Sequence, residues 1–257
     1  MTILHVTDLH FHQPWYTWLA TAAPPHDLLV IAGDLLDLNH PASHQRQTDW
    51  VAEWVRAYDR PLSLCSGNHD LVWDSAHNVW WPARWLQSLA GPTTWVDGDA
   101  AEWRGVTLSH HGATGTTRAQ PADIWVTHVP PLGPGVGWHH DGRAGGDPAL
   151  LYSVRTYAPR LVLSGHVHRP LHWCDRFDGT LYFNPGMERA AKFPNYILID
   201  LADGSARRVR DKGGQVEHDI VLGLAGLPSP LPPEFSPPPT GAARRQLVRE
   251  TSPSLVS

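Results

Sequence analysis

The stretch Ile3-Leu4-His5-Val6-Thr7-Asp8-Leu9-His10 sets a pattern that is repeated along this chain. A short apolar run, typical of a buried strand, leads into a carboxylate and an imidazole. Asp8 and His10 are two positions apart, so in extended backbone their side chains point to the same side. We therefore expect both side chains to contribute to one site where a strand ends.

The same arrangement occurs four more times. The polar segments Gly33-Asp34, Gly67-Asn68-His69-Asp70, Thr127-His128 and Gly165-His166-Val167-His168 each follow a short apolar run. Polar residues just past strand ends form the usual ligand-binding edge of an α/β sheet. Imidazole nitrogen and carboxylate oxygen suit borderline divalent ions such as Mn²⁺, Fe²⁺ or Zn²⁺. The five segments therefore predict a hydrolytic centre that holds two metal ions.

Helical and strand-like segments alternate through most of the chain, which predicts an α/β fold. Apolar residues recur at helical spacing between residues 48 and 58. Asp147 and Pro148 are typical of an N-cap and a first helical position. The closely spaced strand-like runs at 181–183, 196–199 and 207–209 indicate a second, more antiparallel sheet.

Composition narrows the class of protein. The net charge of −5 argues against a nucleic-acid-binding surface. No apolar run is long enough to span a membrane, and residues 1–10 do not resemble a signal peptide. The two cysteines, Cys65 and Cys174, do not indicate a disulfide framework. We expect a cytoplasmic protein, and its oligomeric state stays open.

Proline usage divides the chain into two parts. Prolines cluster between residues 226 and 257, a pattern incompatible with a helix or a central strand. We interpret residues 1–225 as one folded domain and residues 226–257 as a proline-rich, flexible tail.

Taken together, the segments D-x-H, G-D-x-x-D, G-N-H-D, a later His and G-H-x-H resemble the calcineurin-like metallophosphoesterase superfamily over roughly residues 1–200. Segments 127–133 and 146–151 are similar to its small metallophosphoesterase-domain subgroup, whose members resemble phosphodiesterases of small or cyclic nucleotides. The resemblance implies a four-layer α/β/β/α sandwich, with two mixed sheets flanked by helices.

The resemblance also implies a set of ligands and cofactors. One metal would be held by Asp8, His10 and His168. The other would be held by Asn68, His128 and His166, with Asp34 as the bridge. We expect two divalent ions, manganese first, with iron, zinc or nickel as alternatives.

The expected reaction follows from this centre. A hydroxide bridging the two metals would attack phosphorus in line. His69 would protonate the leaving group, and Asp37 would orient His69 and raise its pKa. We expect a phosphodiesterase that acts on a small-molecule phosphoester. The alternatives are a phosphomonoesterase or nucleotide phosphatase, and a metal-bound interaction scaffold.

Two departures from the superfamily narrow the substrate. Protein Ser/Thr phosphatases carry Arg-Gly after G-D-x-x-D, and their third motif ends in Glu. Here Leu38-Asn39 follows Asp37, and the third motif ends in Asp70, which argues against a protein phosphatase. We expect substrate contacts from three residues. His111 follows a strand-like run, Trp138 lies in a loop after the His128 motif, and Arg169 directly follows His168.

Overall fold

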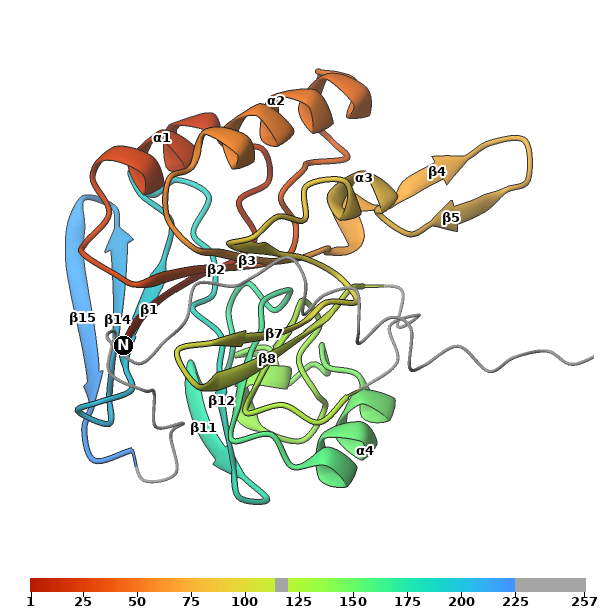
Figure 1. Cartoon of the computed structure of the whole chain (residues 1–257). Helices are drawn as coiled ribbons and strands as arrows, with labels where there is room; N and C mark the ends of the chain where they lie inside the picture. The colour runs from red at the N-terminus through yellow and green to blue at the C-terminus, as the bar shows by residue number, and fades with distance from the viewer. Residues whose placement is uncertain (114–119, 225–257) are drawn as a thin grey trace, which may run out of the picture.

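The computed structural model describes residues 1–113 and 120–224, which form two large β-sheets packed face to face with helices on both outer sides (Figure 1). The first sheet has seven strands, in the order β15 (Gln215–Val221), β14 (Ser205–Lys212), β13 (Tyr196–Asp200), β1 (Thr2–Val6), β2 (Leu28–Ala32), β3 (Leu62–Cys65) and β6 (Thr94–Trp95). The second has six, in the order β11 (Cys174–Phe177), β12 (Thr180–Phe183), β10 (Leu161–Leu163), β9 (Ile124–Thr127), β8 (Val106–His111) and β7 (Ala100–Trp103).

Four α-helices and two 3₁₀ turns complete the described fold. They are α1 (Gln13–Thr21), α2 (His44–Ala57), α3 (Arg84–Gln87), α4 (Pro148–Tyr157), η1 (Asn68–Asp70) and η2 (Gly135–Gly137). Helices α1 and α2 cover the first sheet, and α4 covers the second (Figure 1). The predicted four-layer sandwich of two mixed sheets is therefore confirmed.

Side-chain alternation along the strands builds the layers. In β1, Ile3 faces the second sheet, whereas Leu4 packs with the residues under α1 and α2. In β9, Ile124 lies between the sheets, whereas Trp125 packs with Val154 of α4. Strands with two covered faces read as continuous apolar runs, which is why the sequence showed them so clearly.

The predicted helix starts have clear local causes. Asp147 accepts a hydrogen bond from the backbone N–H of Ala149 at 2.8 Å, and Pro148 is the first helical residue of α4, as predicted. Helix α2 begins at His44, four residues before the apolar periodicity, because the Ser43 side chain accepts from the N–H of Arg46. The polar first turn of α2 explains why hydrophobic spacing did not reveal it.

The expected grouping of the late strands is wrong in part. Strand β12 does join the second sheet, parallel to β10. However, β13 and β14 belong to the first sheet, where β13 pairs antiparallel with β1. The physical reason is that β1 pairs with β2 along one side only, and β13 satisfies the backbone groups along the other.

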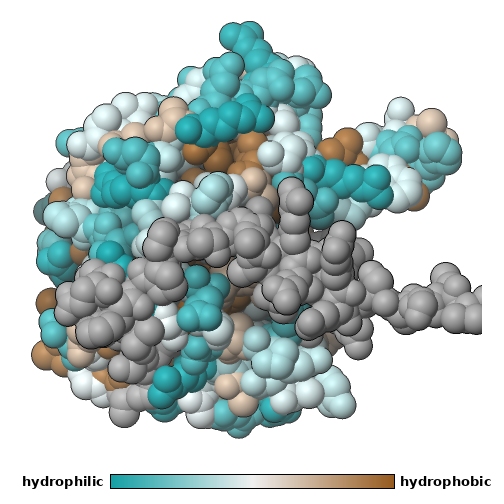
Figure 2. All heavy atoms as spheres, in the orientation of Figure 1, coloured by the Kyte–Doolittle hydropathy of each residue, from teal (hydrophilic) through white to brown (hydrophobic). Residues whose placement is uncertain are grey.

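A two-stranded hairpin, β4 (Val72–Asp74) and β5 (Val79–Trp81), projects from the body directly after η1 (Figure 1). In the space-filling view the hairpin stands clear of the two layers (Figure 2). Trp73, Trp80 and Trp81 are each more than 40% exposed there. Tryptophans at this point do not belong to the core, because no strand or helix within residues 1–113 and 120–224 covers the hairpin.

The proline-rich segment 226–257 lies outside the described residues, so its predicted flexibility stays a prediction. Within the described part of the chain, no helix combines the length and apolar character needed to cross a membrane.

Candidate metal centre

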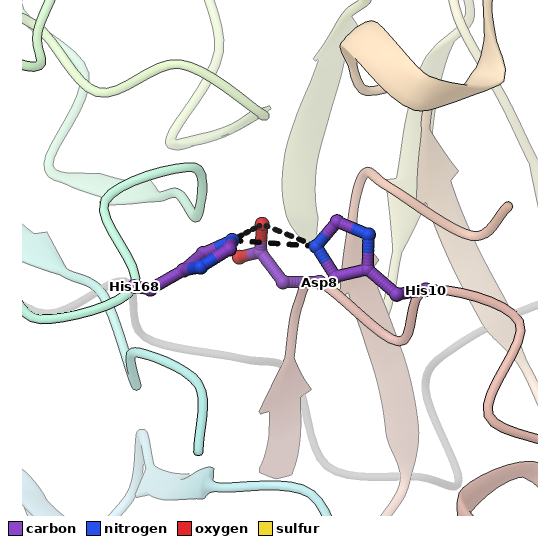
Figure 3. Close-up of side chains that lie close together, drawn as sticks. All are labelled: Asp8, His10 and His168. Carbon is purple, nitrogen blue, oxygen red and sulfur yellow. Dashed lines mark hydrogen bonds and ion pairs between the residues drawn. The ribbon is translucent and has the colours of Figure 1, made fainter. Parts of the chain in front are cut away.

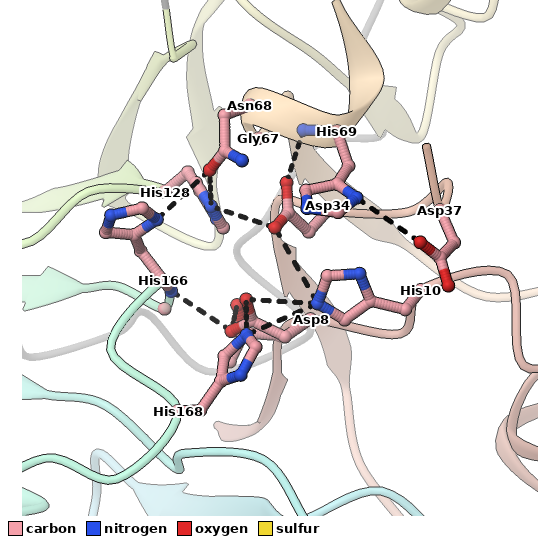
Figure 4. Close-up of polar contacts among 12 residues, drawn as sticks. Asp8, His10, Asp34, Asp37, Gly67, Asn68, His69, His128, His166 and His168 are labelled. Atoms are coloured by element: carbon pink, nitrogen blue, oxygen red, sulfur yellow. Dashed lines mark hydrogen bonds and ion pairs between the residues drawn. The ribbon is translucent and has the colours of Figure 1, made fainter. Parts of the chain in front are cut away.

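All seven predicted ligands meet where the strands of both sheets end (Figure 4). Asp8 follows β1, Asp34 follows β2, and Asn68 lies in η1 just after β3. His128 follows β9, and the segment containing His166 and His168 follows β10. The centre therefore lies at a shared edge, and neither sheet could build it alone.

The first ligand group consists of Asp8, His10 and His168 (Figure 3). The Nε2 atoms of His10 and His168 lie 3.3 Å apart, and His168 Nε2 lies 3.3 Å from Asp8 Oδ1. Two ligands held about 2.1 Å from one ion are about 3.0–3.4 Å apart when they subtend about 90–110°. Two of the three distances therefore match donors around a single ion, and the third, from His10 Nε2 to Asp8 Oδ1, is wider at 3.9 Å.

The second group is centred on Asn68. Its Oδ1 atom lies 3.1 Å from His128 Nε2 and 3.0 Å from His166 Nδ1. Asp34 Oδ2 lies 3.4 Å from His128 Nε2 and 3.8 Å from His10 Nε2. One oxygen of Asp34 thus lies between the two groups, in the position that a bridging carboxylate requires.

In both Asp8 and Asp34, one carboxylate oxygen accepts a backbone hydrogen bond and the other faces the ligand groups. Asp8 Oδ2 accepts from the N–H of His166 at 3.0 Å, and Asp34 Oδ1 accepts from the N–H of His69 at 2.8 Å. Asp8 Oδ1 is buried and has no hydrogen-bond partner among the described residues. A buried carboxylate oxygen left without a partner is costly, and a cation would satisfy it. The residues present therefore fit a divalent metal.

The backbone at the ligands differs from the prediction. Asp8 (φ 53°), His10 (φ 43°), Asp34 (φ 51°) and His166 (φ 64°) all have left-handed backbone. The extended conformation expected between Asp8 and His10 is therefore wrong, although their side chains do converge. Such conformations cost L-residues about 1–3 kcal/mol each. The N–H of His10, which donates to the carbonyl of Asp34 at 2.9 Å, helps to offset that cost.

Three glycines allow the motif segments to approach one another. A Cβ at Gly67 would collide with the Oδ1 and backbone nitrogen of Asp34. A Cβ at Gly165 would collide with the hydroxyl of Thr7, and one at Gly33 with the ring of His128. A side chain at any of these positions would therefore clash with a ligand or with the neighbour of a ligand.

Burial and charge oppose each other at His128 and Asp34. Burial alone would lower the pKa of His128, but the charges of Asp34 and Asp8 outweigh it and raise the pKa to about 10. Burial would likewise raise the pKa of Asp34, yet the charge of His128 lowers it below its usual range. Without metal, the two residues thus form a buried ion pair, in which the proton on His128 occupies the place of a cation.

His69 and Asp37 lie together at the side of the centre, as predicted (Figure 4). His69 Nδ1 is 3.5 Å from Asp37 Oδ1, which is longer than a hydrogen bond. The same Nδ1 accepts from the backbone N–H of Leu38 at 3.1 Å. A ring nitrogen of His69 also lies within 4.8 Å of ligand atoms of His10 and Asp34, which places the imidazole beside the metal centre.

Two residues hold the motifs in register and were not recognised as functional from sequence. Asp70 is fully buried and accepts from the N–H groups of Gly67, Leu36 and Leu35 at 2.7, 2.8 and 3.2 Å. Burial, followed by the charge of Asp34, raises the pKa of Asp70 to about 8. The only signal for this role was the position of Asp70 at the end of G-N-H-D.

Asn184 is the second of these residues. Its side-chain amide donates to the carbonyl oxygens of Gly165 and Val167 at 2.9 and 3.1 Å. These two hydrogen bonds fix the backbone on either side of His166.

Two cavities flank the ligands. One, of about 800 Å³, is bordered by His10, Asp37 and Arg189. The other, of about 400 Å³, is bordered by His168, Arg169 and strand β14, and we call it the His168 cavity. Both volumes suit a small-molecule ligand.

The predicted substrate residues differ in their positions. Arg169 borders the His168 cavity, next to a ligand. His111 instead packs on Trp125, with ring centroids 4.4 Å apart, on the face of the second sheet that α4 covers. Trp138 is half-buried at the end of η2 and borders neither of the two cavities described above. The structure thus brings only Arg169 to the centre, and a substrate role for His111 or Trp138 has no contact to support it.

A family model described as calcineurin-like phosphoesterase matches residues 1–170, which include every predicted ligand. The chain belongs to the calcineurin-like phosphoesterase family. This phosphoesterase therefore shares the metal-dependent phosphoester chemistry of its superfamily. No curated protein sequence matches it.

Several solved structures are similar to this phosphoesterase. A single mutant of Vps29 from Entamoeba histolytica is 14% identical, with a TM-score of 0.47, over 87% of this chain and 99% of its own. Vacuolar protein sorting 29 from Cryptosporidium parvum is 14% identical, with a TM-score of 0.43, over 86% and 96%. YfcE, a phosphoesterase from E. coli, is 14% identical, with a TM-score of 0.40, over 86% and 99%.

Proposed function

We propose that this phosphoesterase is a phosphodiesterase that hydrolyses small or cyclic nucleotide phosphodiesters. The observation that carries the proposal is the position of His69 beside two ligand groups that share Asp34. Hydrolysis of a nucleotide diester expels a poor leaving group, an alkoxide, which needs a proton as it departs. A scaffold has no comparable observation in its favour, whereas a nucleotide phosphatase would also use such a proton donor and is separated by the assay described below.

The donor set supports a pair of divalent ions, with manganese as the favoured metal. When bound, such ions supply an activated water and offset charge on the phosphate oxygens. The protein's part is to hold the ligands in place, through the backbone N–H of His166 on Asp8 and that of His69 on Asp34. No thiolate is among the ligands. Cys65 and Cys174 are both free thiols, which supports a reducing compartment such as the cytoplasm.

His69 supplies the proton. The N–H of Leu38 fixes its ring, and the carboxylate of Asp37 provides negative charge on the same side. The cavity of about 800 Å³ beside His10 and Asp37 offers room for the departing alcohol next to that ring.

The test is a panel of phosphoesters assayed on chelator-treated protein before and after addition of Mn²⁺, Ni²⁺, Zn²⁺ or Mg²⁺. We expect no turnover without metal, and restored hydrolysis of bis-p-nitrophenyl phosphate and of nucleotide diesters with Mn²⁺. Faster hydrolysis of p-nitrophenyl phosphate than of any diester would instead support a phosphomonoesterase. No turnover of any ester with any metal would support a scaffold.

A further inference from the structure

The His168 cavity lies between the last ligand motif and the outer part of the first sheet. His168, Arg169 and Leu171 border it on one side, and Arg208, Arg210, Asp211 and Lys212 of β14 border it on the other. Because a metal ligand forms part of its wall, a molecule bound at the centre can extend into this space. The loop after β10 and strand β14 thus meet in a cavity that the hydrolytic chemistry does not itself require.

Basic residues face the cavity from β14 at every second position. Arg208, Arg210 and Lys212 share one face of the strand, as the period of two requires. Arg208 is committed elsewhere, since its Nε and Nη2 both donate to Asp219 on β15, at 2.9 and 2.6 Å. Arg208 is therefore a structural residue that supports the wall.

Two other cations are held only loosely. The side chain of Lys212 is 69% exposed, and its ammonium lies 3.9 Å from Glu217. The side chain of Arg169 is 66% exposed, and its guanidinium lies 3.8 Å from Glu188. Exposed pairs at such distances contribute little energy, so both cations can turn toward an anion at small cost.

Two buried polar atoms bordering the cavity lack partners within the described part of the chain. One is the Nε of Arg210, whose guanidinium pairs through Nη2 with Glu217 at 2.8 Å, and the other is the Oδ1 of Asn195, an acceptor. Asn195 is only 5% exposed, and its amide nitrogen makes one long contact, 3.5 Å from the carbonyl of Pro185. Both atoms are therefore available to a polar molecule bound in the cavity.

The acidic residues bordering the His168 cavity do not neutralise its loosely held cations. Asp211 also borders the cavity, but its carboxylate already accepts from the backbone N–H groups of Lys192 and Gly214, both at 2.8 Å. Glu188, the other acidic residue there, is the loose partner of Arg169. Outside the cavity lining, Glu217 pairs with Arg210 at 2.8 Å and more loosely with Lys212, and Trp173 and Met187 add apolar surface to the cavity.

We infer that the His168 cavity is a second anion subsite, which binds an additional phosphate on one ester group of the substrate. Lys212 and Arg169 provide charge for that phosphate, the Nε of Arg210 provides a further donor, and Asn195 accepts from a neighbouring hydroxyl. This inference rests on the proposed phosphodiesterase function, and it narrows the substrate to diesters that carry a second phosphate.

The experiment compares two dinucleotides that differ in one group, pApA with a 5′-phosphate and ApA without it. We expect the protein loaded with Mn²⁺ to hydrolyse pApA with a KM about ten- to hundredfold lower, which is the effect of one or two charge-assisted hydrogen bonds. Lys212→Gln should remove most of this preference, and Arg169→Gln part of it. Arg207→Gln is the matched control, because Arg207 is exposed on the opposite face of β14 and should leave the preference intact.

Binding is measured separately, with phosphonate analogues of both dinucleotides that cannot be hydrolysed. Equal affinities for the two analogues would overturn the subsite, even if both dinucleotides are hydrolysed. A preference that survives in both Lys212→Gln and Arg169→Gln would also overturn it. If neither dinucleotide is hydrolysed but the phosphorylated analogue binds more tightly through Lys212, the phosphodiesterase proposal fails and the anion subsite stands.

Discussion

The backbone N–H of Leu38 donates a hydrogen bond to Nδ1 of His69 at 3.1 Å. Because Nδ1 accepts this bond, the neutral imidazole carries its proton on Nε2. Asp37, at 3.5 Å, influences the ring through charge and not through a hydrogen bond. A peptide group thus selects the tautomer of His69 and fixes its ring, whereas we had expected the carboxylate of Asp37 to orient it.

Replacing His69 by Ala should lower the rate most for substrates with poor leaving groups. We expect a loss of about 10²–10⁴ in kcat on a nucleotide diester, the usual contribution of a general acid. The loss on bis-p-nitrophenyl phosphate should be much smaller, because nitrophenolate departs without a proton. Metal content is measured in parallel and should be retained.

His77→Ala is the control for that substitution. The His77 side chain is 72% exposed and pairs with Asp74 on the projecting hairpin, so its removal should leave all rates unchanged. An unaltered rate of His69→Ala on a nucleotide diester would remove His69 from the mechanism.

Metal binding should release a proton from His128. Burial lowers the pKa of this residue, but the charges of Asp34 and Asp8 raise it to about 10, so the metal-free protein holds the proton at neutral pH. Affinity for Mn²⁺ should therefore rise about tenfold per pH unit between pH 7 and pH 9. Calorimetry in buffers of different ionisation enthalpy counts the protons released, and a count of zero would contradict this account.

The same shift predicts how the metal-free fold responds to pH. A histidine whose pKa is raised by folding stabilises the fold fully below its unfolded value of 6.5, and this contribution disappears as pH rises through about 10. The free energy of unfolding of the chelated protein should thus fall between pH 7 and pH 10. Urea denaturation measures it, and His128→Gln should show a smaller decrease.

Divalent metal should stabilise the folded protein. The buried carboxylates of Asp8 and Asp34 gain a counter-ion, and ligand at 100 times its Kd adds about 2.7 kcal/mol to the free energy of unfolding. Thermal melting in increasing Mn²⁺ measures this effect. Asp34→Asn, which removes the bridging charge, should melt at a temperature that depends far less on metal, and an undiminished dependence would argue against the bridge.

Gly67→Ala should damage the centre without touching a ligand side chain. The new methyl group would collide with Asp34, so we expect a loss of about 1–3 kcal/mol of stability together with weakened metal binding. Gly91→Ala is the matched control, because the nearest atom to its Cβ would be 3.9 Å away. Equal metal affinity in the two variants would show that Gly67 has no role in placing Asp34.

Much of the fold follows from local patterns. Apolar runs identified the central strands because both of their faces are covered, and Asp147-Pro148 identified the start of α4. The pairing of β13 with β1 could not be predicted in this way. Period-two spacing indicates that a segment is a strand, but the choice of neighbour depends on which backbone edge is free after the other strands have paired.

The site was predictable to a similar degree. The spacing of the motifs identified the residues that converge, because each motif follows a strand that ends at the same edge. The contacts that position them depend on backbone donors, such as the N–H of Leu38, and these have no sequence signature.

The direction of the His111 side chain follows from the alternation of side chains along β8. In β8, Val106, Leu108 and His110 alternate toward the first sheet, where the His110 ring lies 2.8 Å from the Ser63 hydroxyl. His111 must therefore face the opposite way, toward α4.

Strand β1 lies between β2 and β13. Asp8, just past the end of β1, forms a ligand group with His168, which lies 160 positions later in the chain. During synthesis the first ligands emerge long before the last, and β1 cannot be enclosed until β13 has been made. Long-range pairing of this kind slows folding. A nascent chain therefore lacks a complete ligand set until His168 has been synthesised, so metal cannot guide the folding of the first strands.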